Sequence, residues 1–270
     1  MKRKLFIVCA LVFAVLFFLA GMNIVGWYRE SHDTRMEFVR ISALVDREAA
    51  LNTYAGISGS ADESEGAVPE SPSEESTPEI LPEYLTIYEL NPDFAGWISI
   101  EGTEVDYPVM QTPEEPDFYI DHGFEKETSG YGVPYIQYNC DLLSSDNLIV
   151  YGHYMRNGSM FADIHMYMYK DFYERHKVIR FDTRYTRGSY EVVAAFKTTG
   201  NDYGFPYHHF VNAADEQEFN EYIEKCKELS LYEIETTARY GDKLITLSTC
   251  DYSRRDGRMV VVAKLISDAQ

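Results

Sequence analysis

The chain has 270 residues, of which 44 are acidic and 24 basic, so its formal net charge at pH 7 is −20. This excess of carboxylates argues against a nucleic-acid partner, because phosphate binding depends on clustered Lys and Arg. Hydrophobic residues make up 45% and aromatic residues 14% of the chain, which excludes disorder of the whole protein. Four cysteines are too few to build a disulfide scaffold of this size.

The N-terminus carries an apolar stretch without charge over residues 5–25, about the length that spans a bilayer as a helix. Basic residues at positions 2–4 precede it, and Trp27 and Tyr28 follow it. This arrangement predicts a single-pass membrane anchor over residues 1–27, with the N-terminus in the cytoplasm and the remaining chain outside the cell. The alternative is a cleaved secretory signal, although the apolar run is longer than the usual core of such signals.

Two segments of different character follow the anchor. Residues 28–54 alternate in charge and place Phe38, Ile41 and Val45 at helical spacing, which predicts a helical stalk. Residues 55–79 consist mostly of Ser, Glu, Gly and Pro, which predicts a flexible acidic linker. We therefore expect one folded domain over residues 80–270.

This domain is expected to be mainly β. Segments of β-type composition recur at residues 96–100, 105–110, 133–138, 147–151, 178–181, 190–198, 243–249 and 259–266. The pattern predicts a mostly antiparallel barrel or sandwich. Two helices are predicted within it, over residues 81–90 and 214–229.

Three cysteines lie outside the apolar segment. Cys226 falls on the apolar face of the second predicted helix, and Cys140 falls in a loop; buried cysteines of this kind pack as small hydrophobic residues. Cys250 instead ends an alternating strand. A polar turn containing Asp256-Gly257 follows it, and a new strand begins at Arg258.

A hairpin of this kind places the Cys250 thiol and the Arg258 guanidinium at the same rim of the sheet. A cation beside a thiol favours the thiolate, and a guanidinium can donate hydrogen bonds to a developing oxyanion. The alternative is a structural arginine in a solvated hairpin. Arg254 and Arg255 are weaker candidates, because they lie within the turn.

Acyl transfer by a thiol also requires a group that accepts and donates a proton, usually histidine. Of seven histidines, His153 alone follows directly from the end of an apolar strand, after Gly152, where a residue can enter a cleft. A single histidine is nevertheless more often structural than catalytic. The adjacent pair His208-His209 is only a weak metal signal, and we predict neither a metal nor another cofactor.

Several motifs together resemble one family. Residues 246–250 read TLSTC, with Arg258 opening the next strand, and residues 151–153 read YGH after an apolar strand. This set resembles the sortases, the cysteine transpeptidases of Gram-positive cell surfaces. The segments NPDFAGWI at 91–98 and DYPV at 106–109, Met-Phe at 160–161 and the helix before the cysteine strand are similar to class B sortases along nearly all of the domain.

The resemblance implies an eight-stranded sortase barrel that cuts a sorting motif on a secreted protein. Cys250 would attack the threonyl carbonyl and form a thioacyl enzyme. His153 would protonate the leaving amine and deprotonate the incoming one, and Arg258 would hold the substrate and stabilise the oxyanion. The acceptor would be an amine of a peptidoglycan precursor or of a pilin.

Two alternatives remain open at this stage. One is an exported cysteine peptidase, in which water resolves the acyl enzyme; a papain-type enzyme, however, places its cysteine before its histidine. The other is a membrane-tethered module that binds the cell wall without chemistry. Ser248 and Asp251 flank the nucleophile, either lining the cleft or serving strand and turn structure.

Overall fold

The computed structural model describes residues 2–45, 78–200 and 203–266, and the chain divides into two compact units, residues 1–40 and 41–270. Helix α1 runs over Lys2–Ser42 and is long and apolar enough to cross a membrane, as judged by length and composition. It is continuous because no proline interrupts it. The helix predicted over 28–54 is thus present as far as Ser42. Its last part, residues 46–54, and the predicted linker up to residue 77 lie outside the described residues.

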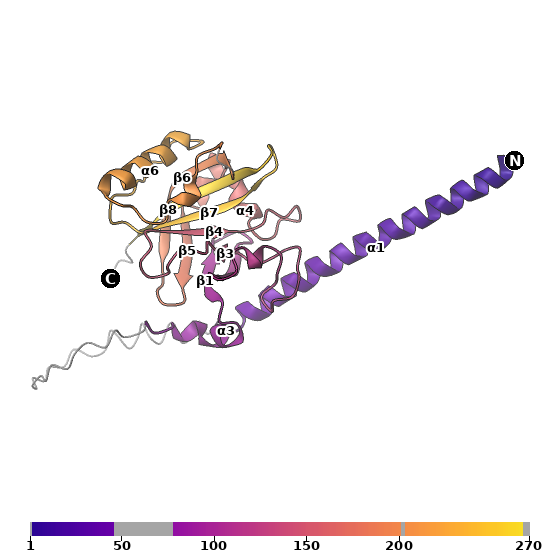
Figure 1. The fold of residues 1–270 in the computed structure, drawn as a ribbon, viewed down its shortest axis with the longest axis horizontal. Helices are drawn as coiled ribbons and strands as arrows, with labels where there is room; N and C mark the ends of the chain where they lie inside the picture. Colours follow the sequence, from indigo (N-terminus) through magenta and orange to yellow (C-terminus); the bar gives the residue numbers. More distant parts are fainter. Residues whose placement is uncertain (1, 46–77, 201–202, 267–270) are drawn as a thin grey trace, which may run out of the picture. The chain divides into compact units, whose positions relative to one another are not determined.

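The C-terminal unit is an eight-stranded closed barrel (Figure 1). The strands lie in the order β1-β2-β3-β4-β7-β8-β6-β5, and the barrel closes where β1 pairs with β5. Only the pairs β2–β3 and β4–β7 are parallel among the described strands. The strands are β1 Phe94–Ser99, β2 Asp106–Met110, β3 Tyr135–Ile136, β4 Asn147–Tyr151, β5 Val178–Thr183, β6 Ser189–Thr199, β7 Leu244–Asp251 and β8 Gly257–Ile266. The predicted mostly antiparallel barrel is confirmed.

Strand β3 is shorter than the predicted segment 133–138. Pro134 has no N–H to contribute to a ladder, although its carbonyl still accepts from Met110 N at 2.9 Å. Regular pairing therefore begins only at Tyr135.

Strands β6 and β8 contain runs of consecutive buried residues, whereas a strand with one exposed face alternates buried and exposed residues. Residues 192–196 and 259–263 are all buried. Helix α6, Glu216–Leu229, lies beside β6 (Figure 1) and buries Phe219, Tyr222 and Ile223. The two faces of these strands are covered, so that apolar residues are favoured on both.

The two predicted helices are present with adjusted ends. Helix α6 begins at Glu216, two residues later than predicted, because Asp215 caps it by accepting from Glu218 N at 3.0 Å. The Glu218 carboxylate in turn accepts from the N–H of Ala214, the residue before the cap, at 2.7 Å, so that two backbone donors at the start of the helix are satisfied. The helix predicted over 81–90 consists of a 3₁₀ turn, η1 Pro82–Tyr84, followed by α3 Leu85–Leu90.

Four short helices were not predicted, because each is too short to produce a helical period in the sequence. They are η2 Phe118–Ile120, α4 Ala162–Met166, α5 Lys170–Arg175 and η3 Tyr207–His209. Helix α4 follows the segment that carries His153 and contributes to the surroundings of the candidate site.

Candidate active site

The β7–β8 hairpin brings Cys250 and Arg258 together as direct cross-strand partners. Asp256, with φ of 54°, turns the chain, and Gly257 follows at a position where a Cβ would overlap the carbonyl oxygen of Asp251. The Asp-Gly pair therefore suits this hairpin on steric grounds. The predicted placement of thiol and guanidinium at one rim is correct.

The parallel pairing of β4 with β7 brings His153 to the same rim. Tyr151 is in register with Ser248, so that His153 and Cys250 each lie two residues beyond a matched pair. Both strands run in the same direction, and both residues therefore emerge at the same end of the barrel. His153, Cys250 and Arg258 line one pocket of about 70 Å³.

The imidazole of His153 is oriented by a backbone carbonyl. Its Nε2 lies 2.6 Å from Ile120 O, and because a carbonyl only accepts, Nε2 carries the proton. Gly152 is needed for close packing, since a Cβ there would meet the Phe161 ring at 2.5 Å.

Arg258 is held from two sides. Its Nη1 donates to Gly257 O at 3.0 Å, and a Cβ at Gly200 would lie 3.1 Å from the guanidinium carbon. By contrast, Arg254 and Arg255 are exposed in the turn and do not line the pocket with Cys250. Of the three arginines, Arg258 is thus the one beside the thiol.

Tyrosines form a wall of the pocket that sequence reasoning missed. Tyr119, Tyr135 and Tyr151 line it, and they come from three separate segments without a common motif. The hydroxyl of Tyr135 donates to Asp117 Oδ1 at 3.0 Å, and that of Tyr151 donates to Gln137 Oε1 at 2.6 Å. Burial raises the pKa of both phenols, so they stay neutral and present apolar rings to the cleft.

The other two described cysteines differ from Cys250 in exposure. Cys140 and Cys226 are buried free thiols, whereas Cys250 is partly exposed. Burial raises the pKa of Cys140 to about 11 and that of Cys226 to about 12. Neither is ionised near neutral pH, so both are poor nucleophiles.

Ser248 and Asp251, which flank Cys250, have different surroundings. Ser248 lines the pocket, where its Oγ lies 2.6 Å from the Tyr207 hydroxyl. Asp251 does not line it; its carboxylate is buried and bonds to His165, Lys197 and Ser253.

No metal site is formed by the histidine pair His208-His209. Both residues lie in η3, and within residues 2–45, 78–200 and 203–266 no three His, Cys, Asp or Glu residues are grouped to hold an ion. His122 stacks on Phe118 with ring centroids 4.0 Å apart, and His176 bonds to Phe172 O at 2.8 Å. These histidines have structural contacts away from the thiol.

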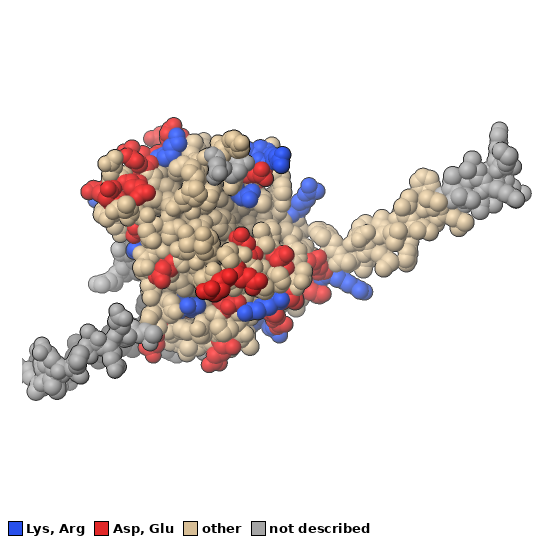
Figure 2. Space-filling view, viewed as in Figure 1, with Lys and Arg blue, Asp and Glu red and all other residues tan. Residues whose placement is uncertain are grey.

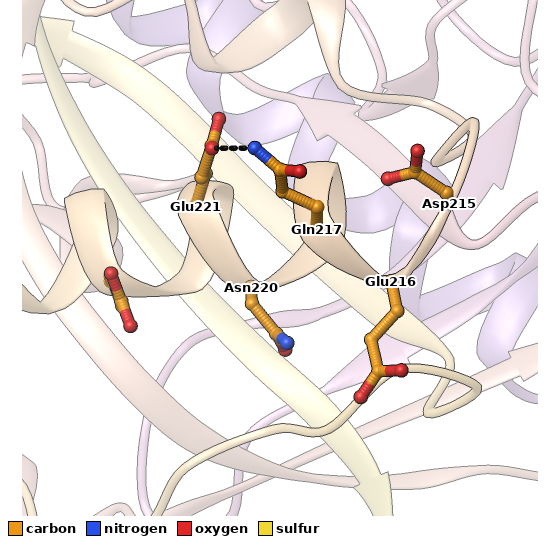
Figure 3. A pocket seen from close by; sticks show the side chains of 6 residues that line it. Asp215, Glu216, Gln217, Asn220 and Glu221 are labelled. Atoms are coloured by element: carbon orange, nitrogen blue, oxygen red, sulfur yellow. Dashed lines mark hydrogen bonds between the residues drawn. The ribbon is translucent and has the colours of Figure 1, made fainter.

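A larger hollow, of about 550 Å³, lies on helix α6 (Figure 3). Its labelled side chains are Asp215, Glu216, Gln217, Asn220 and Glu221, and Gln217 Nε2 donates to Glu221 Oε1 at 2.8 Å. Acidic side chains gather over this part of the visible face (Figure 2). No thiol lines this hollow, so its size does not identify it as the site of thiol chemistry.

Comparisons with known proteins agree with this geometry. The sortase domain family matches residues 98–266. Sortase B of Listeria monocytogenes is 34% identical over 192 residues, which cover 70% of this chain and 76% of that protein. Sortase B of Staphylococcus aureus is 33% identical over 190 residues, covering 69% and 76%.

Solved structures lead to the same family. The Staphylococcus aureus sortase B–substrate complex superposes with a TM-score of 0.71 at 26% identity, covering 88% of this chain and 98% of that one. Sortase B from B. anthracis in complex with AAEK1 superposes with a TM-score of 0.69 at 26% identity, covering 89% and 100%.

The chain belongs to the sortase family. Its relatives are sortase B proteins, which makes it a class B enzyme, as the motifs indicated. It is therefore a cysteine transpeptidase that acts on a sorting motif and transfers the acyl group to an amine. A papain-type peptidase and a non-catalytic wall-binding module do not agree with this membership.

Proposed function

We propose that Cys250 is the nucleophile, His153 the general acid and base, and Arg258 the oxyanion and substrate partner of this transpeptidase. The observation that carries the proposal is their convergence: three residues from β7, β8 and the end of β4 line one pocket. Cys250 is also the partly exposed thiol beside a guanidinium, whereas Cys140 and Cys226 are buried.

The reaction begins with attack of the Cys250 thiolate on the carbonyl carbon of a threonine in the sorting motif. Arg258 donates hydrogen bonds to the oxyanion that forms, where a fixed donor is most effective. The C–N bond then breaks, and protonated His153 supplies the proton that the leaving amine takes. A thioester on Cys250 remains.

The second half of the reaction reverses these roles. Neutral His153 removes a proton from the incoming amine, which attacks the thioester carbonyl. The new amide forms, and the sulfur of Cys250 leaves as thiolate. The hydrogen bond from His153 to Ile120 O supports this assignment, because it fixes the ring while the other nitrogen, Nδ1, exchanges the proton.

The proposal extends to location and partners. Helix α1 would remain as an uncleaved anchor with its N-terminus in the cytoplasm, and residues 28–54 and 55–79 would connect it to the catalytic domain at 80–270. Basic residues on one side of the apolar run and Trp27 with Tyr28 on the other support this orientation. The enzyme would join secreted proteins to a peptidoglycan precursor or pilin amine.

The test uses the full chain in detergent, a library of pentapeptide motifs and triglycine as the acceptor, with mass detection of products. Cys250→Ala, His153→Ala and Arg258→Ala should each abolish nearly all transfer, because the three groups act as a unit. Cys140→Ala and Cys226→Ala are the matched thiol controls, and Arg254→Ala and Arg255→Ala the arginine controls. Transfer by Cys250→Ala would refute the assignment of the nucleophile.

A trapping experiment examines the intermediate. With the acceptor withheld, a peptide should be found as a thioester on Cys250. Loss of activity in Arg254→Ala or Arg255→Ala, with normal turnover in Arg258→Ala, would show that the oxyanion partner is a different arginine.

A further inference from the structure

Helix α4 contacts both halves of the active site. Its N-cap, Phe161, donates its backbone N–H to the carbonyl oxygen of His153 at 2.8 Å. Four residues later, His165 Nε2 lies 3.2 Å from Oδ1 of Asp251, the residue after Cys250. One short helix thus joins the segment that carries His153 to the strand end that carries Cys250.

The carboxylate of Asp251 is the centre of this connection. Only 2% of the side chain is exposed. On Oδ1 it accepts from His165 and from Ser253 N at 3.1 Å. On Oδ2 it accepts from Ser253 Oγ at 2.7 Å and lies 3.3 Å from Lys197 Nζ. These donors come from α4, from β6 and from the β7–β8 turn, so three segments converge on one buried group.

The carboxylate is charged in this setting. Burial favours the neutral acid, but hydrogen bonds from Ser253 and His165 and the contact with Lys197 outweigh burial and lower the pKa of Asp251. A buried charge that accepts from several donors is held firmly in place, because moving it would leave it unpaired. The main chain at the neighbouring Cys250 is therefore held in place as well.

Aromatic packing fixes His165 in turn. Its ring lies against Tyr154 with centroids 4.9 Å apart, and Tyr154 makes an edge contact with Tyr252 at 5.6 Å. Tyr252 follows Asp251 directly in the chain. The imidazole is thus held between α4 and the residues that immediately follow the nucleophile.

Asp251 does not act on the histidine of the pocket. In the described part of the chain, its carboxylate bonds to His165, and His153 Nε2 bonds to Ile120 O. The carboxylate therefore supports the position of the strand end and does not orient the general base.

We propose that His165 and Lys197 are positioning residues, which act through Asp251 to hold Cys250 at its working distance from His153 and Arg258. The inference rests on the proposed function, because it assumes that Cys250 and His153 react together. A displacement of about 1 Å in such a pair costs about 100-fold in rate. Neither residue lines the pocket that contains His153, Cys250 and Arg258, so we expect the effect on the chemical step.

The test compares His165→Ala with His165→Gln in the full chain, using the pentapeptide that the wild type cleaves fastest and triglycine. His165→Ala should lower kcat by up to about 100-fold and leave KM close to the wild-type value. His165→Gln should recover most of this loss, because the Gln amide can also donate to the carboxylate. His176→Ala, at a histidine that bonds to Phe172 O, should behave as wild type.

Lys197 provides a second pair of variants should His165→Ala fail to fold. Lys197→Met should lower kcat, and Lys197→Arg should restore it. Wild-type kcat in His165→Ala or in Lys197→Met, or equal losses in the Ala and Gln variants, would overturn the inference. If the wild type itself forms no thioester on Cys250, the proposed function has failed and not the positioning role alone.

Discussion

At the scale of single residues, reactivity follows exposure more closely than residue type. Cys140, Cys226 and Cys250 are all free thiols, but only Cys250 is partly exposed. The other two are buried, and burial raises the pKa of both thiols. The C-terminal unit thus carries three chemically identical groups, of which the fold makes one available.

This difference predicts selective labelling. A small methanethiosulfonate at pH 8 should modify Cys250 in the folded protein, while Cys140 and Cys226 should react only after denaturation, because thiolate and access are both needed. Peptide mapping by mass spectrometry identifies the labelled sites. Rapid labelling of Cys226 in the folded protein would contradict the packing of α6.

The buried carboxylate of Asp251 should make the free energy of unfolding depend on pH in the acid range. Its pKa is lowered in the folded state, so its stabilising contribution is complete above the unfolded value of about 3.9 and is lost as pH falls through the folded value. Asp251→Asn should therefore be less stable than wild type above about pH 4. This gap should narrow below about pH 4.

Urea unfolding followed by near-ultraviolet circular dichroism at several pH values measures this gap. Glu114→Gln, at an exposed residue, is the control and should follow the wild-type curve. If the difference in stability between wild type and Asp251→Asn widens in acid, the charged carboxylate of Asp251 does not stabilise the folded state.

At the scale of secondary structure elements, barrel closure depends on one glycine. Gly96 of β1 pairs with Thr183 of β5, and a Cβ at Gly96 would overlap the carbonyl oxygen of Asp182. The two strands approach so closely that no other residue fits without movement of the backbone. The seam between β1 and β5 is therefore sensitive to the smallest possible side chain.

Gly96→Ala should lower the free energy of unfolding by about 1–3 kcal/mol or more, because overpacking forces the strands apart. Gly26→Ala is the control, since a Cβ there meets nothing within 4 Å. Chemical denaturation of the two variants provides the measurement. Equal stability would indicate that β5 moves at no cost.

At the scale of the whole molecule, the chain combines an apolar helix with a catalytic barrel. The first residues of the catalytic domain are already bonded to the rest of it. Leu81 N donates to Arg184 O at 2.8 Å, and Glu83 forms an ion pair with Arg187. The composition of residues 55–79 provides little apolar surface to bury. Accessible cleavage sites should therefore lie before residue 80.

Limited proteolysis should first cut within residues 55–79 and release a stable fragment that begins near Ile80. Mass spectrometry of the early products locates the cut. First cleavage inside residues 133–249 would show that the boundary of the domain is wrong.

The anchor makes a separate prediction about processing. The protein should remain with the membrane fraction at full mass, because the apolar run is longer than a typical signal core. Basic residues precede the run and Trp27 and Tyr28 follow it, as is typical of an anchor. Intact-mass measurement of the native protein tests this. A soluble form that begins near Gly21 would instead identify a cleaved signal.

The sequence alone determined the membrane-type helix, nearly all strands and the Cys250–Arg258 pair, because each of these depends on local composition or on a short hairpin. It could not show that His153 lies level with Cys250, since that depends on the parallel register of β4 and β7, which are almost 100 residues apart in the chain. The tyrosine wall and the contact of His165 with Asp251 likewise join distant segments. Such contacts leave no period or motif in the sequence, because packing between segments, and not local propensity, decides them.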